Sequence, residues 1–314
     1  MIKIAVVMDP IEKINPVKDS SFAMMLEAQR RGYEIHYITA NHLYCKHGTA
    51  YAKSQAIEVH DSTTQWFKLA PENHIPLNQF QLILMRKDPP FDMEYIMDTY
   101  ILEQAMSATT HVINKPQALR DANEKFFTET FPECTPENLI SRDPSLLKEA
   151  VMTLGDAIVK PMDGMGGDSI FKTHKKDKNL NVILETVTQN GTKTTMIQKF
   201  IPAISQGDKR ILMINGKPVP YALARIPSAE DFRGNLAKGG TGQGLALSES
   251  DYKICEIVGP KLKAMGIVFA GIDVIGEYLT EVNVTSPTCI RELDKLYNLN
   301  IAGELFDCIE QDIL

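Results

Sequence analysis

The 314-residue sequence lacks the cysteine patterns of metal-binding and disulfide-rich proteins. Its five cysteines are scattered and odd in number, and none forms a CxxC pair or a Cys/His cluster. Neither a zinc site nor a disulfide framework is therefore indicated, and a reducing, cytoplasmic compartment is expected. The seven histidines also form no HxxxH or similar pattern. We interpret the cysteines as structural or incidental.

Long apolar runs and excess positive charge are absent as well. No segment reaches the roughly 18 apolar residues of a membrane span, and the apolar run in MIKIAVVMDP is too short for a signal peptide. The 33 Lys and Arg stand against 40 Asp and Glu, a net charge of −7. Neither a nucleic-acid nor a membrane partner is expected, although a local basic pocket remains compatible with this charge. The 44% hydrophobic content is that of a globular protein.

Strand and helix patterns alternate at the start of the chain. A β-branched run at 2–8, a helix at 22–31 with N-cap candidates before it, and a strand at 34–39 predict a βαβ unit. The expected fold class is α/β, with a Rossmann-like parallel-sheet domain at 1–122. Antiparallel-looking strands and glycine-rich stretches follow. They predict α+β structure in two further domains, at 123–200 and 201–314.

The stretch TEVNVTSPTCIRE ends a predicted strand in carboxylate, amide and hydroxyl groups. A two-residue turn before it would pair Asp273 with Thr280, whereas a three-residue loop at 276–278 pairs Asp273 with Glu281. We expect the longer loop, because it places Asn283 on the same face and turns the neighbouring valines into the core. Three oxygen ligands then converge, which suits Mg²⁺. A solvated polar strand face is the alternative.

A glycine-rich loop follows Lys160 in the stretch IVKPMDGMGGDS. Its glycines permit backbone conformations with positive φ, and successive amides can form an anion-binding concavity. Lys160 supplies a point charge for phosphate. The loop has neither the Walker A pattern nor GxGxxG. A plain hairpin turn beside a surface lysine is the alternative.

Arginines form a third set of candidates. Arg86 follows an apolar strand, where open α/β sheets place their ligands. Others lie among the later strands and loops, namely Arg210, Arg225, Arg233 and Arg291. Arginine suits bidentate recognition of carboxylate and phosphate, so these side chains can form a local site for anionic ligands. The alternative for each is an ordinary surface charge.

Two further segments are candidates for ligand contact. The polar, glycine-rich stretch 225–244 is longer than ordinary loops, which favours a lid that closes over the ligand; a flexible linker is the alternative. The predicted strand end at 198–201 can offer backbone groups to a purine edge, and an interdomain hinge is equally compatible.

Together these residues resemble the ATP-grasp superfamily, and within it the bacterial glutathione synthetases of the Gram-negative type. The resemblance covers nearly the whole chain. Its most specific stretches are MRKDPPFD (85–92), NKPQALRDANEK (114–125), KPMDGMGG (160–167), RGNLAKGG (233–240) and TEVNVTSPTCIRE (280–292).

The resemblance implies an ATP-grasp fold and an ATP-dependent ligation of γ-glutamylcysteine and glycine to glutathione, through an acyl phosphate. It also implies a homotetramer. ATP would be held by Lys125, Lys160, Gly164, Gly166, Gly167, Gln198, Lys199, Ile201 and Asp208. Mg²⁺, or alternatively Mn²⁺, would be bound by Asp273, Glu281 and Asn283. The substrates would be contacted by Arg86, Arg210, Arg225, Arg233, Gly240, Ser286 and Thr288. Catalysis would depend on Arg210 and Lys160.

Two rival functions remain at this point. Another ATP-grasp carboxylate–amine ligase, such as a D-alanine–D-alanine ligase or a glutamate-adding ligase, would share the metal and phosphate residues. A non-catalytic ATP-binding protein of the synapsin kind would use the same fold as a regulatory module. The substrate arginines and the complete set of expected metal ligands argue against the second alternative.

Overall fold

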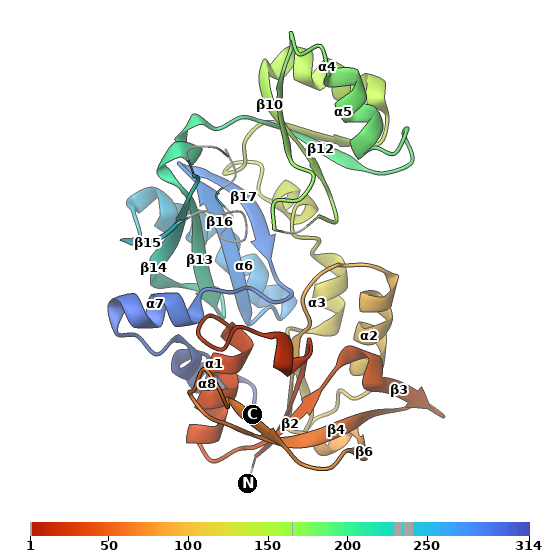
Figure 1. Cartoon of the computed structure of the whole chain (residues 1–314), viewed down its shortest axis with the longest axis vertical. Coiled ribbons are helices and arrows are strands. Elements are labelled where there is room, and N and C mark those ends of the chain that lie inside the picture. Colours follow the sequence, from red (N-terminus) through yellow and green to blue (C-terminus); the bar gives the residue numbers. More distant parts are fainter. Residues whose placement is uncertain (1, 165, 229–233, 235–240) are drawn as a thin grey trace.

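A computed structural model describes residues 2–164, 166–228, 234 and 241–314. Their strands form three sheets, of eight, four and five strands. The first sheet lies at one end of the long axis, beside both chain termini, and the four-stranded sheet lies at the other end (Figure 1). The five-stranded sheet lies between them. None of the described helices is long and apolar enough to cross a bilayer.

The first sheet opens with the predicted parallel unit. Strand β1 (Lys3–Met8) pairs in parallel with β2 (Glu34–Ile38) on one side and with β7 (Leu82–Arg86) on the other. Between β1 and β2 lies α1 (Ser20–Arg30), whose first turn is capped by the Asp19 side chain. The predicted parallel opening is therefore confirmed.

The sequence interpretation missed an antiparallel extension of this sheet. Strand β4 (Thr49–Val59) pairs with β2 in the antiparallel sense, and three short strands pair with β4 in turn. The remaining elements of this part are β3 (Leu43–Lys46), β5 (Phe67–Leu69), β6 (Asn73–Pro76), α2 (Met93–Glu103), β8 (His111–Ile113) and α3 (Pro116–Asp121). Helix α2 ends at Glu103, and Phe126–Thr130 form a 3-10 helix.

The four-stranded sheet is antiparallel throughout, in the order β11-β10-β12-β9. Its elements are β9 (Asn138–Ser141), α4 (Pro144–Leu154), β10 (Asp156–Pro161), β11 (Phe171–His174), α5 (Leu180–Val187) and β12 (Thr195–Lys199). The two helices pack on it over a small core of their own, which includes Leu147, Val159 and Leu184. We call this part the upper lobe (Figure 1).

The five-stranded sheet is also antiparallel and has the order β15-β14-β13-β16-β17. Its elements are β13 (Asp208–Ile214), β14 (Lys217–Ile226), β15 (Thr241–Ala246), α6 (Glu249–Met265), β16 (Phe269–Ile275), β17 (Tyr278–Asn283), α7 (Ile290–Tyr297) and α8 (Ile301–Asp312). One continuous apolar cluster joins residues of this sheet, such as Ile272, to residues of the first sheet, such as Val7. These two parts therefore share a core from which the upper lobe is separate.

Strands β16 and β17 have the predicted pairing of Asp273 with Glu281, but not the predicted loop. Ile275 pairs with Tyr278, so the turn holds two residues instead of three. The register shifts after Asp273 and leaves Thr280 as an extra, bulged residue. The bulge restores the pairing that the apolar pattern requires, since Leu279 and Val282 are both buried. The prediction was right about the register and wrong about the turn.

A buried asparagine joins the first sheet to the last. Asn114 donates from Nδ2 to the carbonyls of Phe269 and Val284, each at 2.7 Å. Its Oδ1 accepts from the amides of Val268 and Phe269 at 2.8 and 3.0 Å. One side chain thus satisfies four backbone groups that would otherwise lie unpaired in the interior.

We expect Asn114→Ala to lower the free energy of unfolding by about 2–5 kcal/mol, because it leaves several buried polar groups without partners. The measurement is the shift in the urea midpoint against Asn73→Ala, whose exposed side chain makes one hydrogen bond to Pro71. Equal midpoints for the two variants would contradict this role.

Candidate active site

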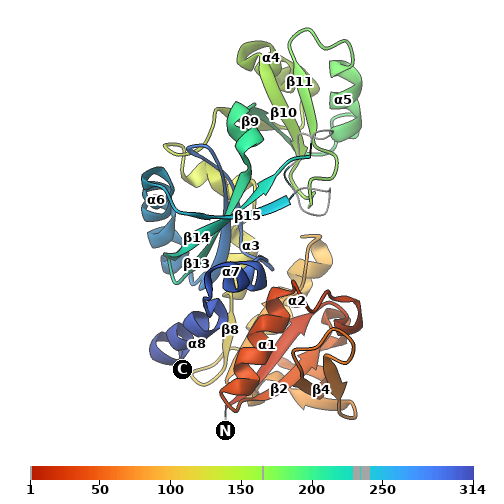
Figure 2. The same ribbon diagram turned by 60° about the vertical axis from the view of Figure 1, so that its left-hand side comes forward.

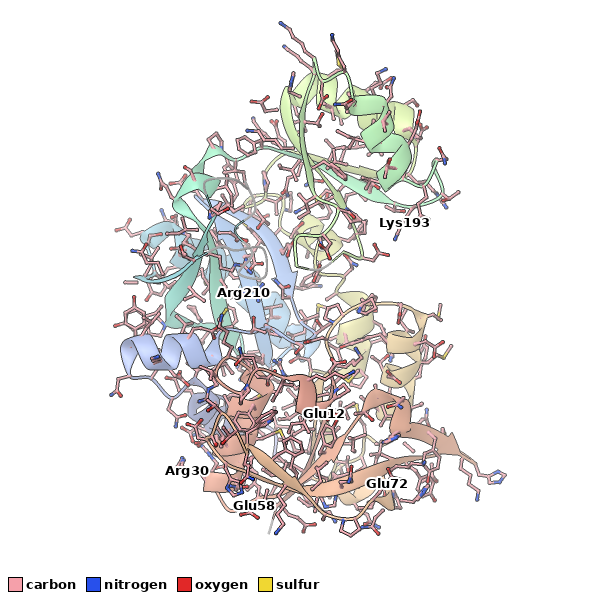
Figure 3. The ribbon with its side chains drawn as sticks, in the orientation of Figure 1. Glu12, Arg30, Glu58, Glu72, Lys193 and Arg210 are labelled. Atoms are coloured by element: carbon pink, nitrogen blue, oxygen red, sulfur yellow. The ribbon has the colours of Figure 1, made fainter. Side chains whose placement is uncertain are left out.

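A cavity of about 560 Å³ lies where the three parts of the chain meet. Arg210, which points into this region from β13, is labelled near the centre of the molecule in Figure 3. The predicted site residues that line the cavity are Lys125, Lys160, Gly164, Gly166, Gly167, Gln198, Lys199, Ile201, Asp208, Arg210, Arg225, Glu281, Asn283, Ser286 and Thr288. Segments far apart in the sequence are thus brought to one place.

Two buried lysines stand on one side of this cavity. Lys125 Nζ donates to the carbonyl of Gly164 at 2.7 Å, contacts Glu124 and lies 3.7 Å from Glu281. Burial opposes its charge, but Glu281 and Glu124 outweigh burial and raise the pKa of Lys125. Lys160 Nζ lies 3.4 Å from the carbonyl of the bulged Thr280, and burial lowers the pKa of Lys160.

Asp208, Arg210 and Arg225 line the cavity and form a buried network with Asp273, which does not line it itself. Arg210 holds both carboxylate oxygens of Asp273, with its Nη2 at 2.9 Å from Oδ2. Arg225 bridges Asp273, at 2.9 Å, and Asp208. Burial alone would raise the pKa of Asp273, but the two arginines hold it well below its usual range. Burial raises the pKa of Asp208 to about 7, since Arg225 offsets only part of that cost.

The three expected metal ligands lie side by side on β16 and β17. Glu281 is paired with Asp273 across the strands, and Asn283 Nδ2 lies 3.3 Å from Asp273 Oδ2. Within the described ranges, no three His, Cys, Asp or Glu side chains form a metal-binding cluster. The three expected ligands are two carboxylates and one amide, and their oxygens are ligands of the kind that Mg²⁺ prefers.

The edge of the cavity beneath the upper lobe carries unpaired polar atoms. Four buried side-chain N or O atoms of the described residues have no hydrogen-bond partner, and two of them are Gln198 Nε2 and Asp208 Oδ1. Both residues line the cavity. Buried polar atoms are normally paired, so these two are suited to a polar ligand.

The glycine-rich loop has the backbone that the sequence suggested. Gly166 and Gly167 have φ of 63° and 82°. A Cβ on Gly164 would approach Pro161 Cγ to 2.8 Å. The backbone conformation thus favours glycine at positions 166 and 167, and the lack of space favours it at position 164.

Arg86 does not line the cavity, although the sequence placed it among the substrate contacts. It is 5% exposed and donates to Ser21 Oγ at 3.0 Å and to the Pro287 carbonyl at 2.8 Å. Arg86 therefore supports the turn that carries Ser286 and Thr288. Arg291 also stays outside and pairs with Asp61.

The remaining candidates, Arg233 and Gly240, lie outside the described residues, as does most of the expected lid at 225–244. The ends of that stretch belong to β14 and β15, which pair with each other.

Several acidic or polar residues of the cavity were missed by the sequence interpretation. They are Glu124, Asn15, Lys18, Asp19, Asp88 and Glu292. Glu124 precedes Lys125, so its neighbour was a usable signal. Asp88 and Glu292 likewise lie within the quoted stretches at 85–92 and 280–292, whereas Asn15, Lys18 and Asp19 come from the segment before α1, outside any such stretch.

Comparison with known proteins identifies the family. The description "Prokaryotic glutathione synthetase, N-terminal domain" matches residues 2–120, and "Prokaryotic glutathione synthetase, ATP-grasp domain" matches residues 124–298. Glutathione synthetase of Vibrio cholerae is 54% identical over 311 residues, covering 99% of this chain and 98% of the relative. That of Escherichia coli K12 is 53% identical over 310 residues, with the same coverage.

Solved structures agree on the fold. D-cycloserine synthetase DcsG aligns with a TM-score of 0.65 at 13% identity and covers 98% of both chains. ATP-grasp ligase PsnB, solved with a minimal precursor, Mg and ADP, aligns with a TM-score of 0.62 at 15% identity, over 98% of this chain and 97% of its own. The predicted ATP-grasp fold is thereby confirmed, and the chain belongs to the prokaryotic glutathione synthetase family.

Proposed function

We infer that this chain is an ATP-dependent carboxylate–amine ligase that joins γ-glutamylcysteine and glycine to form glutathione, ADP and phosphate. Membership in the family supports this reaction. The observation that carries it for this chain is the convergence of Lys125, Lys160, Arg210 and Glu281 on one cavity, with buried Asp273 paired to Glu281 on the adjacent strand. These groups can hold a polyphosphate and a carboxylate together, as phosphoryl transfer to a carboxylate requires.

The nucleotide would lie between the upper lobe and the five-stranded sheet. We assign its phosphates to Lys125, Lys160 and the loop of Gly164, Gly166 and Gly167. The unpaired Gln198 Nε2 would donate to adenine beside Lys199 and Ile201, and the unpaired Asp208 Oδ1 would accept from a ribose hydroxyl. The protein thus supplies a partner of the right kind for each polar part of ATP.

The divalent metal would be bound by Asp273, Glu281 and Asn283, and we propose Mg²⁺, with Mn²⁺ as an alternative. When bound, the metal neutralises charge on the phosphate oxygens. Asp273 is shared with Arg210 and Arg225. The arginines and the proposed metal ligands are thus held in one network, which would keep the guanidiniums beside the phosphates.

The reaction needs an activated carboxylate. The γ-phosphoryl group of ATP passes to the cysteinyl carboxylate, giving an acyl phosphate and ADP. The amine of glycine then attacks the acyl carbon and phosphate leaves. Arg210 is placed to stabilise charge on the transferring group and on the tetrahedral oxyanion.

The peptide substrate would be held by the guanidinium of Arg225 and by the hydroxyls of Ser286 and Thr288 in the turn after β17. Arg233 and Gly240, which lie outside the described residues, are also proposed to contact it, and a lid between β14 and β15 would keep water from the acyl phosphate. We further propose domains at 1–122, 123–200 and 201–314, and a cytoplasmic homotetramer.

ADP release tests the reaction directly. With Mg·ATP, γ-glutamylcysteine and glycine, we expect release that stops when any one component is omitted. D-alanine and free glutamate should not replace the two natural substrates. Release with those amino acids alone would make the chain another ATP-grasp ligase, and ATP binding without release under any combination would make it a regulatory module.

A further inference from the structure

The end of the cavity away from the glycine-rich loop is lined by groups with no role so far. They come from the segment before α1, from the loop after β7 and from the first turn of α7, and they are Asn15, Lys18, Asp19, Asp88 and Glu292. Helices α1 and α7 lie against each other in Figures 1 and 2, at the side of the five-stranded sheet opposite the upper lobe.

The charged groups at this end differ from those around Lys125 and Lys160, where the phosphates are proposed to bind. The charges of Arg86 and Asp88 act on the pKa of Asp19. The charges of Lys18, Arg291 and Asp19 act on the pKa of Glu292. The groups that influence Lys125 and Lys160 instead include Glu124, Glu281, Asp163 and Asp208. Lys18 is exposed, Arg86 is fixed on Pro287 and Arg291 is paired with Asp61. Among the described residues, no buried cation is thus paired with Asp19 or Glu292 alone.

Glu292 has an unsatisfied atom. Its Oε2 is buried, and it finds no hydrogen-bond partner among the described residues. Burial raises the pKa of Glu292, and nearby Asp19 raises it further. Asp19 Oδ1 accepts from the Phe22 amide at 2.7 Å, and the Ser21 backbone also hydrogen-bonds to this carboxylate. Burial raises the pKa of Asp19 as well. A ligand that brings hydrogen-bond donors and positive charge would relieve both carboxylates.

The orientation of the dipeptide follows from the reaction. Its cysteinyl carboxylate must reach the metal ligands and Arg210, so its other end must lie away from them. That end is an amino-acid head group, with an ammonium and a second carboxylate. An ammonium offers three donors and no acceptor, which matches two carboxylates and excludes a neutral head group of the same shape.

We propose that Asp19 and Glu292 bind the α-ammonium group of the γ-glutamyl residue, while Lys18 binds its α-carboxylate. This inference rests on the proposed function and adds the residues that select a γ-glutamyl head group. Asp88, which interacts with the Ser286 side chain, lies beside this subsite and connects it to the substrate turn.

The test compares two substrates with two variants. Glutarylcysteine lacks the ammonium of γ-glutamylcysteine and is otherwise the same molecule. Asp19→Asn keeps a good helix cap, and Glu292→Gln keeps the shape of the side chain. In ADP release with Mg·ATP and glycine, each variant should lose about 10- to 100-fold in kcat/KM for γ-glutamylcysteine and little for glutarylcysteine. A merely structural role would lower kcat/KM equally for both substrates.

Controls separate the possible failures. Asp61→Asn removes an exposed carboxylate that pairs with Arg291, the residue before Glu292, and does not line the cavity, so it should keep the wild-type preference. Wild-type protein without a preference, or variants that retain it, would overturn the inference alone. Wild-type protein that releases no ADP with γ-glutamylcysteine and glycine would overturn the proposed function, and this inference with it.

Lys18 gives an independent arm if either acid variant fails to fold. Its exposed side chain can be replaced by Met without loss of packing. Lys18→Met should lose activity on γ-glutamylcysteine but not on 4-aminobutanoylcysteine, which lacks the α-carboxylate. An equal loss on both peptides would remove Lys18 from the subsite.

Discussion

Glu281→Gln is expected to lower kcat by about 100- to 1,000-fold and to raise the Mg²⁺ concentration needed for half-maximal rate. The amide keeps the size of the side chain but removes a charge from the proposed metal site. It also removes the carboxylate 3.7 Å from Lys125 Nζ. The fold should persist, because Glu281 is only partly buried and Lys125 keeps its bonds to Glu124 and Gly164.

The measurement is the rate of ADP release against Mg²⁺ concentration, with Glu277→Gln as the matched control. Glu277 is in the turn of the same hairpin, and it is exposed. A thermal midpoint within a degree or two of wild type would show that the fold is retained. Near-native turnover of Glu281→Gln at limiting Mg²⁺ would remove Glu281 from the metal site.

Arg210→Lys should cost a similar factor in kcat, about 100- to 1,000-fold, and change KM for ATP much less. Lysine keeps the positive charge but cannot reproduce the planar, two-pronged grip on Asp273. Asp273 would still be paired with Arg225, so no isolated buried charge arises. The expected loss is therefore in stabilising the transition state and not in folding.

Arg30→Lys is the matched control for this variant. Arg30 also holds a carboxylate with two nitrogens, both at 2.7 Å from Glu27, but it lies on α1 far from Arg210 (Figure 3). It should keep full kcat. If Arg210→Lys turned over within about threefold of wild type, Arg210 would be a structural partner of Asp273 and nothing more.

Local patterns in the sequence predicted the parallel opening and the face of β17. Alternation alone put Glu281 and Asn283 opposite the core, and the structure has them there. The bulge at Thr280 could not be read from the same pattern, because a longer turn and a bulge give the same pairing. The antiparallel strands around β4 were missed for a different reason. They are short or mixed in polarity, so their pairing depends on the sheet they extend.

The candidate site also contains some residues that the sequence revealed and others that it did not. Lys160 and the glycines that follow it were found because residues that are neighbours in the sequence contribute to the same candidate site and form one pattern. Asp19 and Glu292 reach the cavity from opposite ends of the chain, and only the packing of α1 against α7 makes them neighbours. Arg86 became a ligand-site candidate because it follows a strand end, and in the structure its side chain donates to the Pro287 carbonyl.

The bulge at Thr280 has a consequence for how this part of the chain can change in evolution. Side chains along β17 alternate between core and cavity, so one residue more or fewer between the turn and Glu281 would exchange the two sets. Such an insertion or deletion would send Glu281 and Asn283 into the apolar interior and turn Val282 towards the cavity. The carbonyl of Thr280 also faces Lys160 Nζ, which ties the phase of the strand to the upper lobe. Substitutions in this hairpin can therefore accumulate one at a time, while changes of length must come in compensating pairs.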